Sequence, residues 1–568
     1  MYIDVVPNRN SRPALLLRQS RRQGNKTIKK TLANMTTWPK ALVDTIRLAL
    51  QGETLVPQEG LFTIERSIPH GHVAAVLGTL RKLGMDELLA SKHCRERDLA
   101  VAMIVQRLLD PCSKLATTRE WHDTTLAQEL GVEDASEDDL YAALDWLLAR
   151  QERIENKLAK KHLHEGAVVL YDLTSSSYYG RTCPLATYGH NRDGTALPCI
   201  AYGLLADRQG RPVSVDVYEG HTGDPTTVPD QVDKLRTRFG LSRVVLVGDR
   251  GMLTDTQITT LREYPGLGWI SALRSGAIRS LVESEALQLS LFDAQNLAEI
   301  TSADFPGERL MACYNPLLAE DRKRTRQELL DATEKRLEKI AAQVRRRTKK
   351  PLTAGAIGVT AGKVINRYQV GKHFKLTIED NRFTFERDEA LITREAQLDG
   401  VYVVRTSEAS ADLSKEDTVR TYKSLSQVEQ AFRCLKGVDL RVRPIHHRTP
   451  GHVRAHIFLC TLAYYLEWHL RKALAPVLFQ DEELDHARTG RDPVAKAAPS
   501  DGVKKKKASG ITADGWPVHS FQTLMKYLGT RCRNTCRAVN DKHHATFYQL
   551  TEPTPLQAHV FQLLGLKP

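Results

Sequence analysis

Two runs of apolar residues, each ending near an aspartate, constrain the fold of this chain most strongly. Residues 167–173 read Ala-Val-Val-Leu-Tyr-Asp-Leu and include Asp172, and residues 243–248 read Arg-Val-Val-Leu-Val-Gly directly before Asp249. Continuous apolar runs are typical of strands that helices cover on both faces. A carboxylate that closes such a strand is expected to be paired, metal-bound or solvent-facing, because burying it alone is costly. Either aspartate alone is also compatible with a turn or a helix cap, but two at the ends of neighbouring strands favour a ligand site.

The segments around these runs predict a ribonuclease H-like α/β fold. Apolar patterning and turn residues indicate further strands and helices in the order strand, strand, helix, helix, strand, at residues 198–206, 212–219, 225–239, 255–263 and 269–273. Together with the two apolar runs, this gives three strands followed by alternating helices and strands, which resembles the ribonuclease H-like arrangement.

A third acid lies on a predicted helix. Apolar residues recur every three or four positions over residues 418–436, which indicates one amphipathic helix. Tyr422, Glu429 and Lys436 are seven residues apart and form a polar stripe, with Arg433 four residues beyond Glu429. The alternative is an exposed helix whose Glu429–Arg433 pair contributes only about 0.2–0.5 kcal/mol.

The same residues match a family signature. Tyr422, Glu429 and Lys436 fit the pattern Y-x2-R-x3-E-x6-K, and Leu425 stands where the pattern has Arg. In this segment the chain resembles one large branch of the DDE transposases of bacterial insertion sequences. The departure at Leu425 removes a cationic contact that the family's arginine makes.

The segments that carry the two aspartates support the resemblance. Tyr-Asp-Leu-Thr-Ser surrounds Asp172 and Gly-Asp-Arg-Gly-Met surrounds Asp249, and the separation of 180 positions from Asp249 to Glu429 suits a family member with a large insertion there. The resemblance runs from about residue 167 to residue 466. It implies a transposase that binds the terminal inverted repeats of its element and cuts and joins DNA by a cut-and-paste route.

The resemblance also implies a metal site. Phosphoryl transfer on DNA uses two Mg²⁺ ions, which prefer oxygen ligands. We expect Asp172 to bridge both ions and Asp249 and Glu429 to complete one each, with Mn²⁺ able to substitute. By resemblance, Tyr422 and Lys436 hold phosphates near the cleaved transposon end.

The charge distribution predicts DNA contacts. The formal net charge is +13, and basic residues gather in residues 1–40, 341–375 and 433–454. The last strip contains Arg433, Arg441 and Arg443 beside the predicted Glu429 helix. Cationic surface of this kind follows a phosphate backbone, so we expect these three arginines to bind DNA.

Changes in composition along the chain predict seven segments. They are a basic β-rich segment (1–65), a helical DNA-binding domain (66–165), the first part of the catalytic core (166–274), an insertion with a long helix and strands (275–398), the second part of the core with the Glu429 helix (399–488), a disordered linker (489–510) and a C-terminal tail (511–568). Within the insertion, residues 317–350 read as the long helix and residues 364–369 as a strand.

Other features suggest location and partners. No run approaches the ~18 apolar residues of a membrane span, no secretory signal is apparent, and the nine cysteines are scattered. We therefore expect a cytoplasmic, nucleoid-associated bacterial protein. Its partners would be double-stranded DNA, as element ends and target, and a second copy of the chain in a synaptic dimer.

Two other interpretations stay open. One is a related ribonuclease H-like nuclease that only hydrolyses DNA, and the other is a catalytically inactive, domesticated DNA-binding protein. The stripe at Tyr422, Glu429 and Lys436 favours the transposase over the first, and the presence of all three acids argues against the second.

Overall fold

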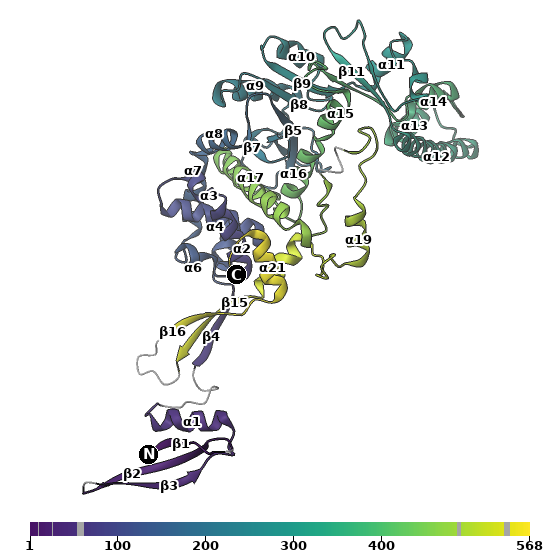
Figure 1. Ribbon diagram of the computed structural model, residues 1–568. Coiled ribbons are helices and arrows are strands. Elements are labelled where there is room, and N and C mark those ends of the chain that lie inside the picture. The colour runs from purple at the N-terminus through teal and green to yellow at the C-terminus, as the bar shows by residue number, and fades with distance from the viewer. Residues whose placement is uncertain (10, 25, 54–61, 485–489, 539–545) are drawn as a thin grey trace. The chain divides into compact units, whose positions relative to one another are not determined.

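A computed structural model of the chain describes residues 1–9, 11–24, 26–53, 62–484, 490–538 and 546–568 (Figure 1). The chain divides into two compact units, Met1–Pro69 with Arg531–Glu552, and His70–Thr530 with Pro553–Pro568. In the described part of the chain, no helix combines the length and the apolar character needed to cross a membrane.

The smaller unit contains two three-stranded antiparallel sheets. The first is a meander of β1 (Tyr2–Val6), β2 (Ala14–Gln23) and β3 (Lys26–Asn34), followed by α1 (Lys40–Leu50), within the segment predicted to be β-rich. In the second, β15 (Cys532–Ala538) lies between β16 (Thr546–Leu550) and β4 (Phe62–Pro69). The segment interpreted as a C-terminal tail therefore pairs with a strand almost 470 residues earlier, which no local pattern reveals.

The larger unit begins with a helical region. Its helices are α2 (Gly71–Lys82), α3 (Met85–Leu89), α4 (Arg95–Leu109), α5 (Lys114–Glu120), α6 (Leu126–Leu130), α7 (Glu137–Leu148) and α8 (Gln151–His162). Local signals start and stop them: Ser136 and Asp139 form a capping box on α7, and Gly131 ends α6 with a φ of 65°. The apolar faces of α4 and α7 pack against α17 (Pro450–Ala473), which joins this region to the rest of the unit.

The centre of the larger unit is a mixed eight-stranded sheet in the order β10-β11-β14-β9-β8-β5-β6-β7. The strands are β5 (Ala167–Ser177), β6 (Cys199–Asp207), β7 (Pro212–Glu219), β8 (Val244–Val247), β9 (Leu267–Ala272), β10 (Leu297–Ile300), β11 (Arg309–Tyr314) and β14 (Val401–Thr406). β5, β8 and β9 run parallel, β6 is antiparallel to β5, and β7 pairs with β6 in an antiparallel hairpin and so runs in the direction of β5 again. The connecting helices include α9 (Val228–Asp233) and α10 (Asp255–Arg262). This mixed α/β arrangement agrees with the ribonuclease H-like core expected from the sequence.

The expected insertion at 275–398 needs correction. After α11 (Ser275–Glu283) and a 3-10 turn (Leu289–Asp293), β10 and β11 extend the central sheet, because β11 pairs with β14 and β14 with β9. The separate part therefore begins only at α12 (Pro316–Arg346), which matches the predicted long helix.

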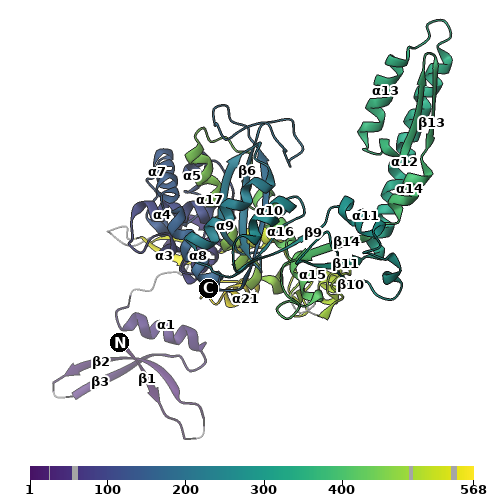
Figure 2. The same cartoon turned by 90° about the horizontal axis from the view of Figure 1, so that it is seen from above.

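This separate part is a small layered body. It comprises α12, α13 (Ala354–Arg367), a 3-10 turn (Gly371–His373), β12 (Phe374–Glu379), β13 (Arg382–Arg387) and α14 (Glu389–Ala396). α12 and α13 pack together beside the β12–β13 hairpin (Figure 2). The strand predicted at 364–369 is wrong: Ile357 and Ala361, four residues apart, bury one face of α13 against Leu337 of α12, and the helix runs on to Arg367.

The remaining elements correct two further predictions. The helix predicted over 418–436 is two helices, α15 (Lys415–Lys423) and α16 (Ser426–Lys436), with a corner at Ser424 and Leu425. The linker predicted at 489–510 contains α19 (Asp501–Ser509), whose Lys506 is only 8% exposed. Lys506 Nζ donates to the carbonyl oxygens of Ala475 and Leu478 at 3.0 and 3.2 Å, so a lysine run that suggested disorder includes an internal anchor.

The larger unit closes with a 3-10 turn (Ala475–Val477), α20 (Phe521–Gly529) and α21 (Pro555–Leu564). Both helices pack on α2, so the C-terminal residues complete the helical region.

Candidate active site

Strand register brings the first two acids together. β5 and β8 are neighbours in the sheet and run parallel, with Leu170 opposite Val247. Asp172 and Asp249 each follow such a paired position by two residues, so they lie at equivalent points of adjacent strands, whose spacing is about 4.8 Å. The expectation that the two apolar strands are adjacent is confirmed.

Asp172 is in an environment that opposes its negative charge. Loss of surrounding water raises the pKa of its carboxyl to about 7, and the nearby charge of Asp249 acts in the same direction. The Leu173 amide donates to Asp172 Oδ1 at 2.8 Å and, with Arg192, only partly offsets this. A positive charge between the two carboxylates would stabilise both.

Backbone amides hold Asp249 in place. Its Oδ1 accepts hydrogen bonds from the amides of Gly251 and Met252, at 2.9 and 2.7 Å. This is a local turn, and Oδ2 receives no hydrogen bond from any described residue. The alternative interpretation of Asp249 as a turn residue thus holds for Oδ1, while Oδ2 remains available to a ligand.

Helix α16 carries Glu429 to the same place. The helix packs on β5 through its apolar face, and Phe432 meets Tyr202 of β6 edge to face at 6.0 Å. Asp172, Asp249 and Glu429 together line an open pocket of about 690 Å³, which we call the acidic pocket. The structure therefore joins all three acids, although 257 residues separate the first from the last.

Glu429 is not engaged in the ion pair that was the alternative explanation. Both Glu429 and Arg433 are exposed, and neither side chain forms a hydrogen bond or ion pair with the residues described here. Arg433 lines the acidic pocket as well. The carboxylate is therefore available to a ligand.

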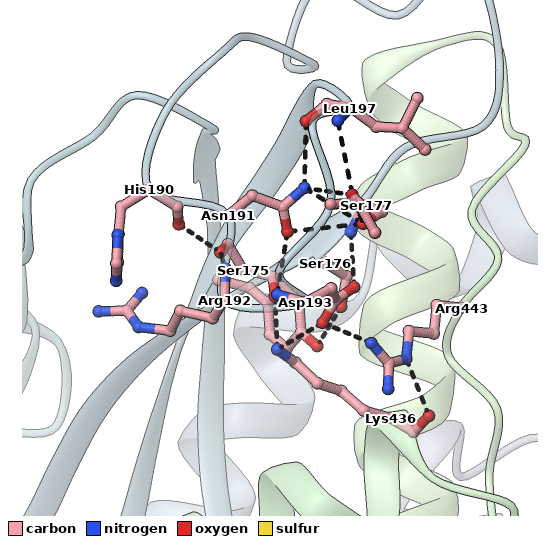
Figure 3. Close-up of polar contacts among 12 residues, drawn as sticks. Ser175, Ser176, Ser177, His190, Asn191, Arg192, Asp193, Leu197, Lys436 and Arg443 are labelled. Carbon is pink, nitrogen blue, oxygen red and sulfur yellow. Dashed lines mark hydrogen bonds and ion pairs between the residues drawn. The ribbon is translucent and has the colours of Figure 1, made fainter. Parts of the chain in front are cut away.

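A loop after β5 holds two of the predicted DNA-binding residues. Lys436 Nζ lies 3.2 Å and an Arg443 guanidinium nitrogen 2.5 Å from the same oxygen, Asp193 Oδ1 (Figure 3). Asp193 Oδ2 accepts from the amide of Ser177 at 2.8 Å, and Lys436 also donates to the carbonyl oxygen of Ser175. Lys436, Arg443 and Asp193 all line the acidic pocket.

Sequence reasoning missed Asp193. Burial raises the pKa of its carboxyl, but the hydrogen bonds from Arg443 and Ser177 and the charge of Lys436 outweigh burial, so the net pKa is lowered. The only local signal was the polar stretch His-Asn-Arg-Asp-Gly at residues 190–194. Nothing in that stretch indicates which basic residues it meets.

Comparison with known proteins decides the family. A family model described as the transposase DDE domain matches residues 167–466, from the first residue of β5 into α17. The chain belongs to the DDE transposase family. The matched segment contains all three acids of the acidic pocket. No curated protein matches the sequence.

The corner between α15 and α16 places the remaining signature residues of this transposase. Tyr422 ends up beside the acidic pocket, where it lines a smaller cavity of about 180 Å³ with Arg250. Burial, followed by the negative charge of Asp249, raises the pKa of Tyr422 to about 12. Leu425, at the arginine position of the signature, is 9% exposed and belongs to the main hydrophobic core.

Arg441, like Tyr422, is a predicted DNA-binding residue that does not line the acidic pocket. It is exposed and lines a second, cationic cavity, which Arg443 also lines.

A different group of side chains meets a geometric criterion for a metal. Among the described residues, only Cys434, Asp439 and Glu467 place three possible ligand atoms within 4.8 Å of one another. Arg471 already donates to Glu467 at 2.6 Å and pairs with Asp439 at 3.1 Å, so it supplies the positive charge there. The acids of the transposase pocket are more widely spaced, but their all-oxygen donor set and mutual repulsion suit a hard divalent cation.

Proposed function

We propose that this chain is the transposase of a bacterial insertion sequence, which binds the terminal inverted repeats of its element and cuts and joins DNA by cut-and-paste transposition. The observation that carries the proposal is the acidic pocket, where adjacent parallel strands supply Asp172 and Asp249 and a packed helix supplies Glu429.

Two Mg²⁺ ions would be held by these acids, with Asp172 shared and Asp249 and Glu429 each completing one. When bound, the ions activate the attacking oxygen and stabilise the leaving oxygen of the phosphodiester. The donors fit, since hard oxygen ligands suit Mg²⁺, and Mn²⁺ should replace it. The raised pKa of Asp172 means that loading the site displaces a proton from this carboxyl near neutral pH.

The rest of the pocket would position DNA. Arg433 is exposed in the pocket and free of acids, so it is suited to a phosphate. Lys436 and Arg443 stand at the pocket wall on Asp193, which orients both cations toward a DNA strand. Tyr422 lies beside the acids and would contact the cleaved end from the neighbouring cavity, while exposed Arg441 would contact the backbone farther along.

The other segments have roles in this proposal. The helical residues 66–165 would bind the element ends, with the basic residues 1–65 adding nonspecific affinity. Two copies of the chain would form the synaptic complex, because two ends must be held together. Such a protein would act in the bacterial cytoplasm, on the nucleoid.

The decisive experiment compares cleavage with joining. Purified protein, Mg²⁺ and DNA carrying the element's own ends should give both cleavage and strand transfer. Asp172→Asn, Asp249→Asn and Glu429→Gln should each abolish both while end binding persists. Exposed Glu263→Gln, which lies outside the acidic pocket, is the matched control and should stay active.

Three results would count against the proposal. Activity that survives all three substitutions would remove the acids from the mechanism. Cleavage without joining would favour the hydrolytic nuclease. End binding without any cleavage in Mg²⁺ or Mn²⁺ would favour the inactive DNA-binding protein.

A further inference from the structure

A second large cavity of the larger unit lies beside the loop that follows α16. It has a volume of about 850 Å³, and α4, α5, α7, the loop at 441–449 and α17 form its walls. We call it the cationic pocket. Its lining includes Arg107, Lys114, Tyr141, His447, His452 and His456.

Two cations in this pocket are buried without an acid. Lys114 is 5% exposed, and its ammonium group has no hydrogen bond or ion pair with any residue that the structure describes. Arg107 is 6% exposed and forms no ion pair in the described chain; it donates to the carbonyl oxygen of Cys112 at 3.3 Å. Two carboxylates, Glu137 and Asp138, line the pocket, but neither pairs with Lys114 or Arg107. Buried charges are normally paired, so the pocket lacks a counter-ion.

The histidines show the same excess of positive charge. Burial first, and then Lys114, lower the pKa of His447 to about 3, and burial also lowers the pKa of His456 well below its usual value. The two rings lie 4.9 Å apart. His456 Nε2 donates to the carbonyl oxygen of Val442 at 2.9 Å, and its buried Nδ1 has no hydrogen-bond partner among the described residues. Both rings therefore stay neutral next to the two cations.

The charged form of the Lys114 ammonium group is disfavoured in this environment. Burial, followed by the charge of Arg107, lowers its pKa to about 7. An anion in the pocket would reverse both effects, because it pairs with the ammonium group and opposes the repulsion from Arg107.

We propose that the cationic pocket binds a backbone phosphate of the DNA, at Lys114 and Arg107, outside the acidic pocket. This rests on the proposed function only in taking DNA as the substrate. Continuity between the two pockets favours a DNA strand over a free phosphate compound: Arg443 lines both, and exposed Arg441 and Arg448 line the cationic one. A strand leaving the acids thus remains against positive charge.

The test uses Lys114→Met, which removes the charge and keeps an unbranched side chain, and Lys114→Gln in case the first variant does not fold. Lys526→Met is the matched control, since Lys526 is exposed on α20, outside residues 66–165, and does not line the cationic pocket. All proteins are measured in EDTA, so that metal at the acids plays no part. The first measurement is the shift of Tm with inorganic phosphate. The second is the affinity for a 30-base-pair duplex at several KCl concentrations.

Phosphate should raise the Tm of the wild type and of Lys526→Met but not that of the Lys114 variants. Without phosphate, Lys114→Met should melt above the wild type, because an unpaired buried charge has been removed. The slope of log affinity against log salt should be smaller by about 1 in the Lys114 variants, the value for one lost phosphate contact.

Equal salt slopes in wild type and both Lys114 variants would overturn the proposal. If the phosphate effect on Tm is lost but the slope is unchanged, the pocket takes a free phosphate compound, and the DNA assignment is wrong. Asp172→Asn separates this proposal from the proposed function: it should lose strand transfer and keep the wild-type salt slope. If the salt slope is smaller in Lys114→Met but the wild type neither cleaves nor joins DNA, the cationic pocket still binds a DNA phosphate and the proposed transposase function is rejected.

Discussion

Replacing Asp193 by Asn tests how the pocket wall is held. Asp193 uses both carboxylate oxygens: Oδ2 accepts from the Ser177 amide, and Oδ1 faces Lys436 and Arg443. Asparagine has one acceptor oxygen and one donor group, so it must either face the Ser177 amide with a donor or turn its amide toward the two cations. One set of contacts is therefore lost.

The magnitude follows from burial. The side chain of Asp193 is 3% exposed and that of Lys436 is 12% exposed, whereas Arg443 is 38% exposed and can reach water. Breaking a fully buried pair costs about 3–5 kcal/mol. Because solvent screens Arg443, we expect Asp193→Asn to lower the free energy of unfolding by about 2–3 kcal/mol.

Urea denaturation of the full chain at pH 7, followed through the unfolding of the larger unit, measures this loss of free energy of unfolding. Asp233→Asn, an exposed acid at the end of α9, is the control and should change stability by less than about 0.5 kcal/mol. Lys436→Met in the Asp193→Asn background should cost less than it does in the wild type, because the cation has already lost its partner.

The pH dependence adds a sign. Since the folded-state pKa of Asp193 is below its ordinary value of 3.8, its contribution is fully present above that value and is lost as pH falls through the lowered pKa. The gap between wild type and Asp193→Asn should thus be constant from pH 5 to 8 and shrink below about pH 4. Two results would refute the role of Asp193 in holding Lys436 and Arg443. One is a free energy of unfolding for Asp193→Asn within about 0.5 kcal/mol of the wild type. The other is strict additivity of the stability losses of Asp193→Asn and Lys436→Met.

Three further predictions concern other parts of the chain. The pKa of Asp172 is about 7, so without metal its contribution to stability is present below pH 3.8 and is lost as pH rises to 7. In EDTA, the Tm of the wild type should therefore fall relative to that of Asp172→Asn over this range. With Mg²⁺ in place of EDTA, the Tm of the wild type should recover. A flat difference between the two proteins would contradict this. Leu425→Arg, which matches the family signature, should destabilise the protein by about 2–4 kcal/mol because the side chain is buried, whereas Leu425→Met should cost less than about 1.5 kcal/mol; thermal denaturation measures both, and equal Tm values would place Leu425 outside the core. Lys506→Ala should speed limited proteolysis within residues 490–510, whereas exposed Lys505→Ala should not; identical digestion would mean that α19 is not anchored by Lys506.

Local patterns predicted much of the architecture. Apolar runs identify the first half of β5 and all of β8, because a strand covered on both faces tends to be continuously apolar. Helical spacing of apolar residues likewise predicts the long helix α12. The same reasoning failed for α13, where residues 364–369 were predicted to form a strand but are helical and pack on α12. Helical spacing also predicted one helix in place of α15 and α16, because the spacing continues through the corner at which Leu425 is buried.

The sequence by itself indicated three candidate acids: Asp172 and Asp249 follow apolar runs, and Glu429 lies in a segment that resembles a family signature. Only the tertiary structure decided their surroundings. Strand register places the first two side by side, and Asp193 meets Lys436 across more than 240 residues. The burial of Lys114 likewise depends on helices from distant segments. The physical reason is that periodicity reports which face of an element is buried, whereas charge, pKa and ligand geometry depend on which elements become neighbours.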